Sequence, residues 1–231
     1  MVRITIKDGK AQIGASVSAS EISGEVSYIN KTIGTKAVAD NVVILDVVNN
    51  PYSNTPLYTK TYMQRLDGIT LKSGSVLYSK TNSKGEISEM IVQNATGDMY
   101  SYGIVTSVTQ GTSNTLRSAV IESNGMSYTV MGMSGLSVGL PVKFIKNGNI
   151  ADYAVKLKEI SGTVSEFTNG YAVINGKRCL FGDNILVYEQ NGTKYMKISI
   201  SDAIDGNYRY TCYSDDSANG RIRIVIVNKK G

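Results

Sequence analysis

The chain has 231 residues, of which 42% are hydrophobic and 19% charged, so it can bury substantial cores and wholesale disorder is not expected. It contains no histidine, which removes the most frequent general base and metal ligand, and no apolar run approaches the ~20 residues of a membrane-spanning helix. The net charge of +5 is scattered along the chain, which favours an ordinary solvated surface over the alternative of a polyanion-binding face.

The first residues alternate apolar and polar side chains on both sides of Asp8-Gly9, over residues 2–17. Alternation around an Asp-Gly pair is typical of a β-hairpin closed by a tight turn. The same residues lack the charged-then-apolar pattern of a signal peptide. If the protein works outside the cell, we expect its export signal to lie outside this segment.

Further along, stretches rich in Val, Ile, Tyr and Thr are broken about every 8–12 residues by pairs such as Asn-Gly or Lys-Gly. Many of the 23 glycines stand at these breaks, where a positive φ is needed. The chain is therefore predicted to be all-β, built from tandem small β-barrel or β-sandwich repeat modules. At most one helical turn is expected, near residues 199–204.

Three stretches open alike, with Gly, any residue, Val and then Ser or Thr. They are SGEVSYI from Ser23, YGIVTSV from Tyr102 and SGTVSEF from Ser161. Internal repetition of this kind indicates related modules. It predicts that Val26, Val105 and Val164 occupy equivalent, buried positions of three strands.

Three stretches also close alike, each with an aliphatic residue, a glycine shortly after it, and a predicted hairpin. The predicted turns lie at Lys84-Gly85, Asn147-Gly148 and Asn219-Gly220. Between the opening and the closing stretches, Asp40-Asn41 aligns with Asp183-Asn184. These matches extend the repeat into the interior of the first and last modules.

A second interior match sets Tyr62-Met63 against Tyr195-Met196, and the middle module is shorter and lacks that segment. The first module carries an extra loop over residues 48–56. Its two prolines cannot donate to a strand ladder, so we expect this loop to lie outside the sheet.

The repeats predict three β modules at residues 23–94, 95–159 and 160–231. Residues 2–27 resemble residues 142–165 along their whole length, through the junction into the next module. Residues 1–22 are therefore expected to be the closing hairpin of a truncated preceding unit. Because a lone hairpin is marginal in water, we expect it to pack on a neighbour or to complete a barrel.

No catalytic residues, cofactor-binding residues or metal ligands are predicted, because no nucleophile elbow, phosphate loop, dinucleotide fingerprint or paired carboxylates stand out. The chain is thus expected not to be an enzyme. The one acidic cluster, with Asp215, Asp216 and Asn219, could hold Ca²⁺ but lacks the EF-hand pattern. We favour a hairpin turn there, since Asp, Ser and Asn side chains bond their local backbone.

Aromatic and basic residues alternate only in the last module. Tyr208 and Tyr210 flank Arg209, and Arg221 and Arg223 alternate in the following strand. Such a face could stack bases or sugars, as OB-type barrels do. Tyrosine is also a good strand former that packs on half-buried faces, and we favour this interpretation.

Cys179 and Cys212 are the only cysteines, and their separation does not match a zinc spacing. We predict reduced, separated thiols. The alternative is a disulfide within the last module, which would require an oxidising compartment.

The repeat pattern, opening with Gly-x-Val-Ser/Thr and closing with an aliphatic residue, Gly and a hairpin, resembles modules of Gram-positive surface proteins. It is similar to the β-rich C-terminal regions of clostridial-type proteins that carry S-layer homology domains. The resemblance covers about residues 2–228 and defines no site residues, and the S-layer homology motif itself is not present. It implies exposed spacer or assembly units whose wall anchor lies elsewhere.

The leading functional hypothesis is a non-catalytic structural and interaction module of an S-layer-like protein at the cell surface, outside the cell. Its expected partners are other surface-protein copies or cell-wall polymers, with no membrane span. The alternative is a carbohydrate- or cell-wall-polymer-binding module that uses tyrosine-bearing strands. A nucleic-acid-binding tandem barrel is the third hypothesis, and nucleic acid is not the expected partner.

Overall fold

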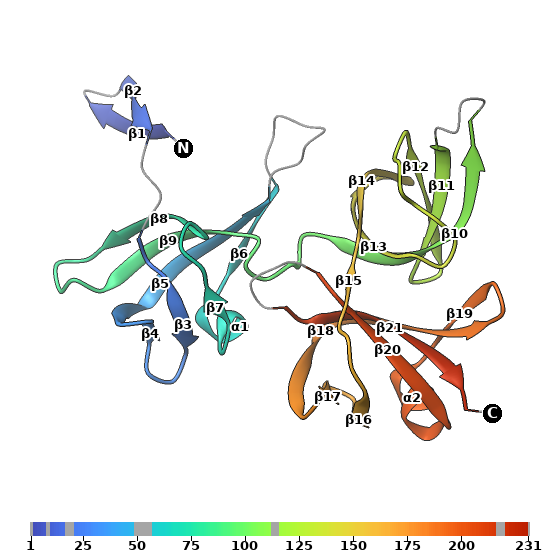
Figure 1. Ribbon diagram of the computed structural model, residues 1–231. Helices are drawn as coiled ribbons and strands as arrows, with labels where there is room; N and C mark the ends of the chain where they lie inside the picture. Colours follow the sequence, from blue (N-terminus) through green and yellow to red (C-terminus); the bar gives the residue numbers. More distant parts are fainter. Residues whose placement is uncertain are drawn as a thin grey trace. The chain divides into compact units, whose positions relative to one another are not determined.

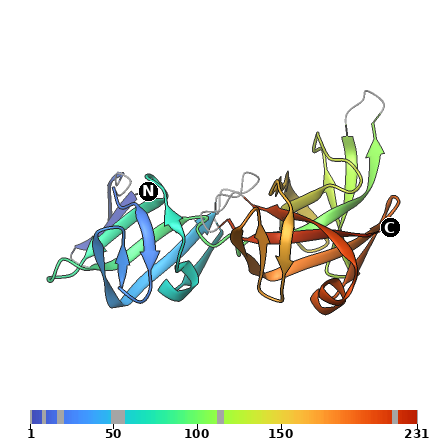
Figure 2. The ribbon, with the colours of Figure 1, turned by 60° about the horizontal axis from the view of Figure 1, so that its bottom comes forward.

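The computed structural model describes residues 2–7, 10–16, 21–48, 57–111, 116–215 and 220–230, and Figures 1 and 2 show the ribbon from two directions. Strands dominate this part of the chain and only two short helices interrupt them, which confirms the predicted all-β class. The chain forms two compact units, the first reaching Met99 and the second starting at Tyr100.

The predicted N-terminal hairpin is present. Strand β1 (Val2–Lys7) pairs antiparallel with β2 (Lys10–Ser16) and forms a separate two-stranded sheet, drawn in blue in Figure 1. The predicted turn at Asp8-Gly9 lies outside the described residues.

A seven-stranded sheet, here called the first sheet, follows in the first unit. Its neighbouring strands run in the order β7-β3-β4-β5-β9-β8, and β6 pairs with β5. The long central strand β5 is parallel to β9, whereas the other pairs are antiparallel. The elements are β3 (Gly24–Ser27), β4 (Thr32–Ile33), β5 (Lys36–Val48), β6 (Leu57–Thr61), α1 (Met63–Leu66), β7 (Thr70–Leu71), β8 (Val76–Thr81) and β9 (Ile87–Gln93).

A closed five-stranded barrel opens the second unit, in the order β10-β11-β12-β14-β13. Its fourth strand, β13, returns beside the first, so β13-β10-β11-β12 is a Greek key. Strand β14 then closes the barrel, antiparallel to β13 and parallel to β12. The strands are β10 (Ser101–Gln110), β11 (Leu116–Ser123), β12 (Met126–Met131), β13 (Pro141–Asn147) and β14 (Ile150–Lys156).

The third sheet completes the second unit, and its path β16-β17-β18-β21-β20 repeats the path β3-β4-β5-β9-β8 of the first sheet. The edge strands differ, since β7 pairs with β3 whereas β15 pairs with β20. The strand order of the third sheet is β15-β20-β21-β18-β17-β16, with β19 on the long strand β18 and with β18 parallel to β21. The elements are β15 (Lys158–Glu159), β16 (Val164–Phe167), β17 (Tyr171–Ile174), β18 (Lys177–Asn191), β19 (Lys194–Ile198), α2 (Ile200–Asp205), β20 (Tyr208–Ser214) and β21 (Ile222–Lys229). Neither of the two helices in the described chain is long and apolar enough to cross a membrane.

The opening motif has a physical cause in its glycine. Gly24 and Gly162 have φ of +122° and +139°, a backbone conformation that residues with a side chain rarely adopt. Gly103 has ordinary φ, but a Cβ there would lie 2.3 Å from the carbonyl oxygen of Glu122 on the paired strand. Each copy of the opening motif therefore requires glycine at this position. In the first and last modules the cause is the backbone conformation, and in the barrel it is the closeness of the paired strand.

The three opening valines pair in the same way. Val26 lies opposite Ile33, and Val105 and Val164 likewise lie opposite isoleucines of the next strand. Val26 and Val105 are fully buried, as predicted. Val164 is only half-buried, so the expectation of three equally buried positions is wrong for the last module. The edge of the third sheet ends at β16, which leaves this valine without a covering strand.

The Asp-Asn repeat marks the same feature in both seven-stranded sheets. The parallel register of β5 and β9 shifts between Val38 and Val43, on either side of Asp40-Asn41. The register of β18 and β21 shifts between Phe181 and Leu186, on either side of Asp183-Asn184. The predicted alignment is therefore structural: the motif forms a corner at which the long strand changes its pairing.

The second interior match is wrong. Tyr62 is the N-cap residue of α1 and Met63 begins that helix, whereas Tyr195 and Met196 lie in strand β19. The counterpart of Tyr62 is Ser199, the N-cap of α2, whose hydroxyl accepts a hydrogen bond from the Asp202 amide at 3.0 Å. Helix α2 is the helical turn predicted near residues 199–204, but α1 was not predicted.

The predicted closing hairpins form from β8–β9, β13–β14 and β20–β21. Gly85, Gly148 and Gly220 all have positive φ, as their turns require. Asn219, predicted beside Gly220, lies outside the described residues. Of the loop predicted over residues 48–56, Val48 ends strand β5 and the rest lies outside the described residues.

Candidate functional site

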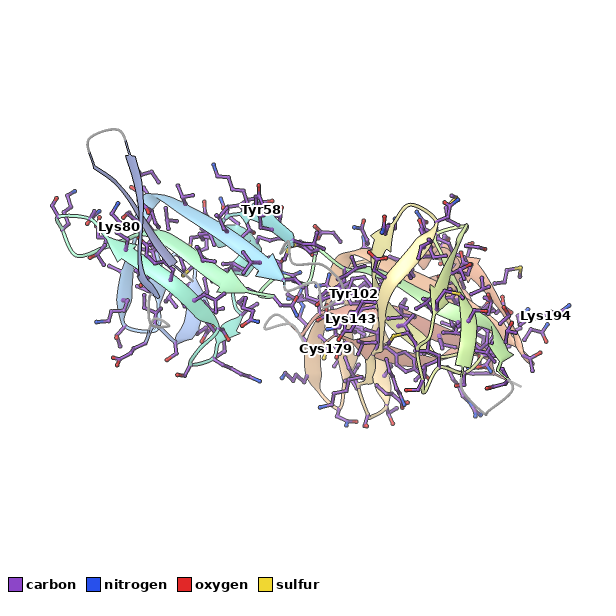
Figure 3. All side chains as sticks on the ribbon, turned by 90° about the horizontal axis from the view of Figure 1, so that it is seen from above. Tyr58, Lys80, Tyr102, Lys143, Cys179 and Lys194 are labelled. Carbon is purple, nitrogen blue, oxygen red and sulfur yellow. The ribbon has the colours of Figure 1, made fainter. Side chains whose placement is uncertain are left out.

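The barrel and the third sheet meet at a buried polar cluster. The Tyr102 hydroxyl, on β10 of the barrel, donates a hydrogen bond to the carboxylate of Asp215. The Arg223 guanidinium, on β21, donates to the same carboxylate oxygen at 2.9 Å and lies over the Tyr102 ring, 5.0 Å from its centroid. The side chains of Arg223 and Asp215 are 3% and 0% exposed. Figure 3 labels Tyr102 beside Lys143, its neighbour on β13.

A glycine on the neighbouring strand β18 leaves space for this cluster. A Cβ at Gly182 would lie 2.4 Å from the Arg223 guanidinium, so the glycine admits the arginine at this point of β18. A buried charge is tolerated only when it is paired and hydrogen-bonded. The hydroxyl of Tyr102 and the guanidinium of Arg223 together meet that condition for Asp215.

An apolar core surrounds the cluster and is shared by the two sheets. It contains barrel residues and third-sheet residues, among them Tyr102, Ile104, Leu157, Leu186, Tyr188, Ile224 and Ile226. Tyr188, on β18, is fully buried, and its hydroxyl donates to the Glu122 carbonyl of the barrel at 3.3 Å. Burial raises the pKa of this phenol far above its ordinary value, so it stays neutral and keeps donating. The second unit is thus held together by a dry core with hydrogen bonds across it.

The acidic cluster considered for Ca²⁺ is used differently. Asp215 belongs to the buried cluster with Tyr102 and Arg223. Asp216 and Asn219 lie outside the described residues. No group of three or more Asp, Glu or Cys side chains that could hold a metal ion occurs in the part of the chain that the structure describes.

The aromatic and basic residues of the last module pack internally. Tyr208 is buried and its hydroxyl donates to Glu189 at 3.2 Å. Tyr210 stacks on Phe167 with ring centroids 4.4 Å apart, and its hydroxyl donates to the carbonyl of Ala203. These contacts favour packing over ligand stacking for the two tyrosines.

The three arginines of the same region differ in their surroundings: two make contacts inside the protein, and one is exposed to solvent. Arg223 is buried in the cluster described above, and Arg221 donates to the Phe181 carbonyl at 3.2 Å. Arg209 is exposed. These two tyrosines and three arginines therefore do not form one common face on which bases could stack.

Cys179 and Cys212 are separate, free thiols, as predicted. Cys212 is buried in the core of the third sheet, and burial raises its pKa to about 12. Cys179 is half-buried and lines a hollow of about 630 Å³ next to Asn175 and Lys177.

We expect the two thiols to react at very different rates. At pH 8 a thiol with a pKa near 12 is ionised in only about one molecule in ten thousand, and only the thiolate reacts. Brief alkylation of the native protein, followed by peptide mass spectrometry, should label Cys179 and spare Cys212. Alkylation in denaturant without reductant should label both. Equal native labelling, or a denatured mass that shows no alkylation, would contradict the structure.

A second feature lies at the Asp-Asn corner of the first sheet. Two adjoining hollows of about 250 and 460 Å³ share Lys31, Val38, Ala39 and Asp40. Lys31 and Asp40 form an ion pair at the mouth of both hollows, with each side chain more than half exposed. Hydrogen bonding between them lowers the pKa of Asp40 and raises that of Lys31. Both groups therefore remain charged at neutral pH.

The smaller hollow has aromatic walls. Tyr28, from the loop between β3 and β4, and Tyr62, at the start of α1, line it together with Gln64. The larger hollow is lined in addition by Asn82 and Glu86 of the β8–β9 turn. The Asn82 amide donates to Glu86 at 2.8 Å, which fixes both side chains.

The repeat pattern pointed to Asp40-Asn41, but no binding role was predicted for Tyr28 or Tyr62. Tyr28 lies in the turn that follows β3, where no hairpin loop was predicted, and an aromatic residue just after the opening motif was the available signal. The partnership of Asp215 with Tyr102 could not be found in this way, since 113 residues separate them.

Comparison of the chain with protein-family models, with curated proteins and with solved structures returns no match, so its function is argued from these two features alone.

Proposed function

We propose that the chain is a non-catalytic structural and interaction module of a bacterial cell-surface protein of the S-layer-like, Gram-positive kind. The observation that carries the proposal is the shared core of the second unit. There, tyrosine, arginine and aspartate side chains that could have formed a ligand site hold the barrel and the third sheet to one another.

A structural role in a surface layer would explain why these polar side chains join the barrel to the third sheet. Modules that are joined only by a linker move independently, whereas a large apolar interface with buried hydrogen bonds suppresses relative motion. The repeated modules and the glycine-rich turns support the same role, since an exposed scaffold can be built from many short, locally determined strands.

Localisation on intact cells tests the proposal. Antibodies raised against the chain should label intact cells of the source organism, and a chaotrope that dissociates non-covalent surface layers should release the labelled protein. Labelling that requires permeabilised cells, with the protein recovered in the cell interior, would overturn the proposal. A cytoplasmic protein of known location serves as the control for cell integrity.

A further inference from the structure

We propose that the two adjoining hollows at the corner of the first sheet form a binding site for a neutral oligosaccharide chain. We call them the corner groove, defined by Tyr28, Lys31, Asp40, Tyr62 and Asn82. This site goes beyond the structural role proposed above and stands on separate residues. It also lies elsewhere than the tyrosine-bearing strands of the last module.

The aromatic walls suit a sugar ring. Tyr28 is 41% exposed and Tyr62 is 60% exposed, so both rings present accessible faces. An aromatic face attracts the C–H groups of a pyranose, while the tyrosine hydroxyl remains available for hydrogen bonding. The buried residues Val38 and Ala39, which line both hollows, have small side chains and so leave space in the groove.

The polar groups suit sugar hydroxyls. Lys31 donates, Asp40 accepts, and the amide of Gln64 can do both from the same hollow. Asn82 and Glu86 extend this set into the larger hollow and are held by their mutual hydrogen bond. A concave site with a few fixed polar groups around an apolar floor is the usual form of a small-molecule subsite.

The charges favour a neutral chain over a polyanion. The two hollows are lined by two lysines, Lys31 and Lys84, and by two carboxylates, Asp40 and Glu86. Proteins that bind nucleic acids or other polyanions need an excess of cations to replace the counterions along the chain. A balanced lining offers no such excess.

The position in the fold supports a ligand site. The groove lies between the β3–β4 loop and the β8–β9 turn. These two connections join the first two and the last two strands, in sequence, of the five-stranded path β3-β4-β5-β9-β8 within the first sheet. Loops at these two positions bind oligosaccharides or oligonucleotides in five-stranded Greek-key barrels. In the third sheet, Glu166 replaces Tyr28 in the aligned opening and Ser199 replaces Tyr62. The aromatic walls are therefore a property of the first sheet.

The test uses the full chain and an array of short neutral oligosaccharides, with a sulfated glycan and single-stranded DNA as charged probes. The chain should bind at least one neutral oligosaccharide in high salt. Calorimetry with that glycan should show that Tyr28→Ala and Tyr62→Ala each weaken binding by about tenfold or more, which corresponds to ~1.4 kcal/mol.

Tyr58→Ala is the matched control, because Tyr58 is an exposed tyrosine of the same sheet that lines neither hollow (labelled in Figure 3). It should leave affinity unchanged. Gln64→Ala, at an exposed position, provides a second groove variant should a tyrosine variant fail to fold. Binding of no neutral glycan, salt-sensitive binding of the charged probes alone, or equal losses in the Tyr58 variant would overturn the proposal.

Discussion

Val26→Asp and Val105→Asp are each expected to lower the free energy of unfolding by several kcal/mol. Both valines are fully buried, one in the core of the first sheet and one in the barrel. Aspartate forfeits ~1.5–3 kcal/mol of apolar burial and also places a carboxylate within a cluster of buried apolar residues. Because a domain is commonly stable by only about 5–15 kcal/mol, either change can unfold its module. Urea denaturation followed by circular dichroism measures the loss.

Val164→Asp is the matched comparison. It changes the same residue of the repeat, but Val164 is half-buried at the edge of the third sheet, so a carboxylate there can reach water. We expect a clearly smaller destabilisation than at Val26 or Val105. A loss of equal size at all three positions would contradict the difference in burial between the modules.

Asp215→Ala is expected to destabilise the second unit by about 3–5 kcal/mol, the usual effect of breaking a buried ion pair. The change leaves the Arg223 guanidinium and the Tyr102 hydroxyl in the interior without the carboxylate that accepts both hydrogen bonds. Thermal unfolding monitored by calorimetry should show a lower transition for the second unit. The transition of the first unit should be unchanged, since Asp215 lies outside it.

The double variant Asp215→Ala with Arg223→Met separates the two components of this effect. Replacing a buried ion pair by apolar residues of similar volume is often close to neutral, so the double variant should recover much of the lost stability. If the double variant were as unstable as Asp215→Ala, shape and not charge would explain the loss. Tyr102→Phe, which removes one donor and retains the ring, should cost only ~1–2 kcal/mol.

The all-β class, the opening motif and the closing hairpins could be predicted because each depends on local causes. A position that requires φ of +122°, as at Gly24, selects glycine, and the buried position two residues later, Val26, selects an apolar side chain. Asp40-Asn41 and Asp183-Asn184 could be aligned for the same reason. The alignment of Tyr62-Met63 with Tyr195-Met196 was wrong because two identical residues carry little information. Helix α1, which begins at Met63, was not predicted from the sequence.

The functional features depended on contacts that no local pattern encodes. The cluster of Tyr102, Asp215 and Arg223 joins two sheets, and its members differ from exposed tyrosines and charged residues only by their partners. The corner groove combines residues from a loop, a strand corner, a helix start and a turn. Periodicity locates each element along the chain, but it does not show which of their side chains converge.

The order of the strands within each sheet has a consequence for synthesis on the ribosome. In the barrel and in both seven-stranded sheets the last strand in sequence has a neighbour on each side: β9 lies between β5 and β8, β14 between β12 and β13, and β21 between β18 and β20. A growing chain therefore cannot complete the core of a sheet until its final strand has left the exit tunnel. For the third sheet, the residues still missing at that stage would include Ile222, Ile224 and Val225, all fully buried in the finished protein. Each of these three cores therefore stays incomplete, with apolar surface exposed, until its last strand is available.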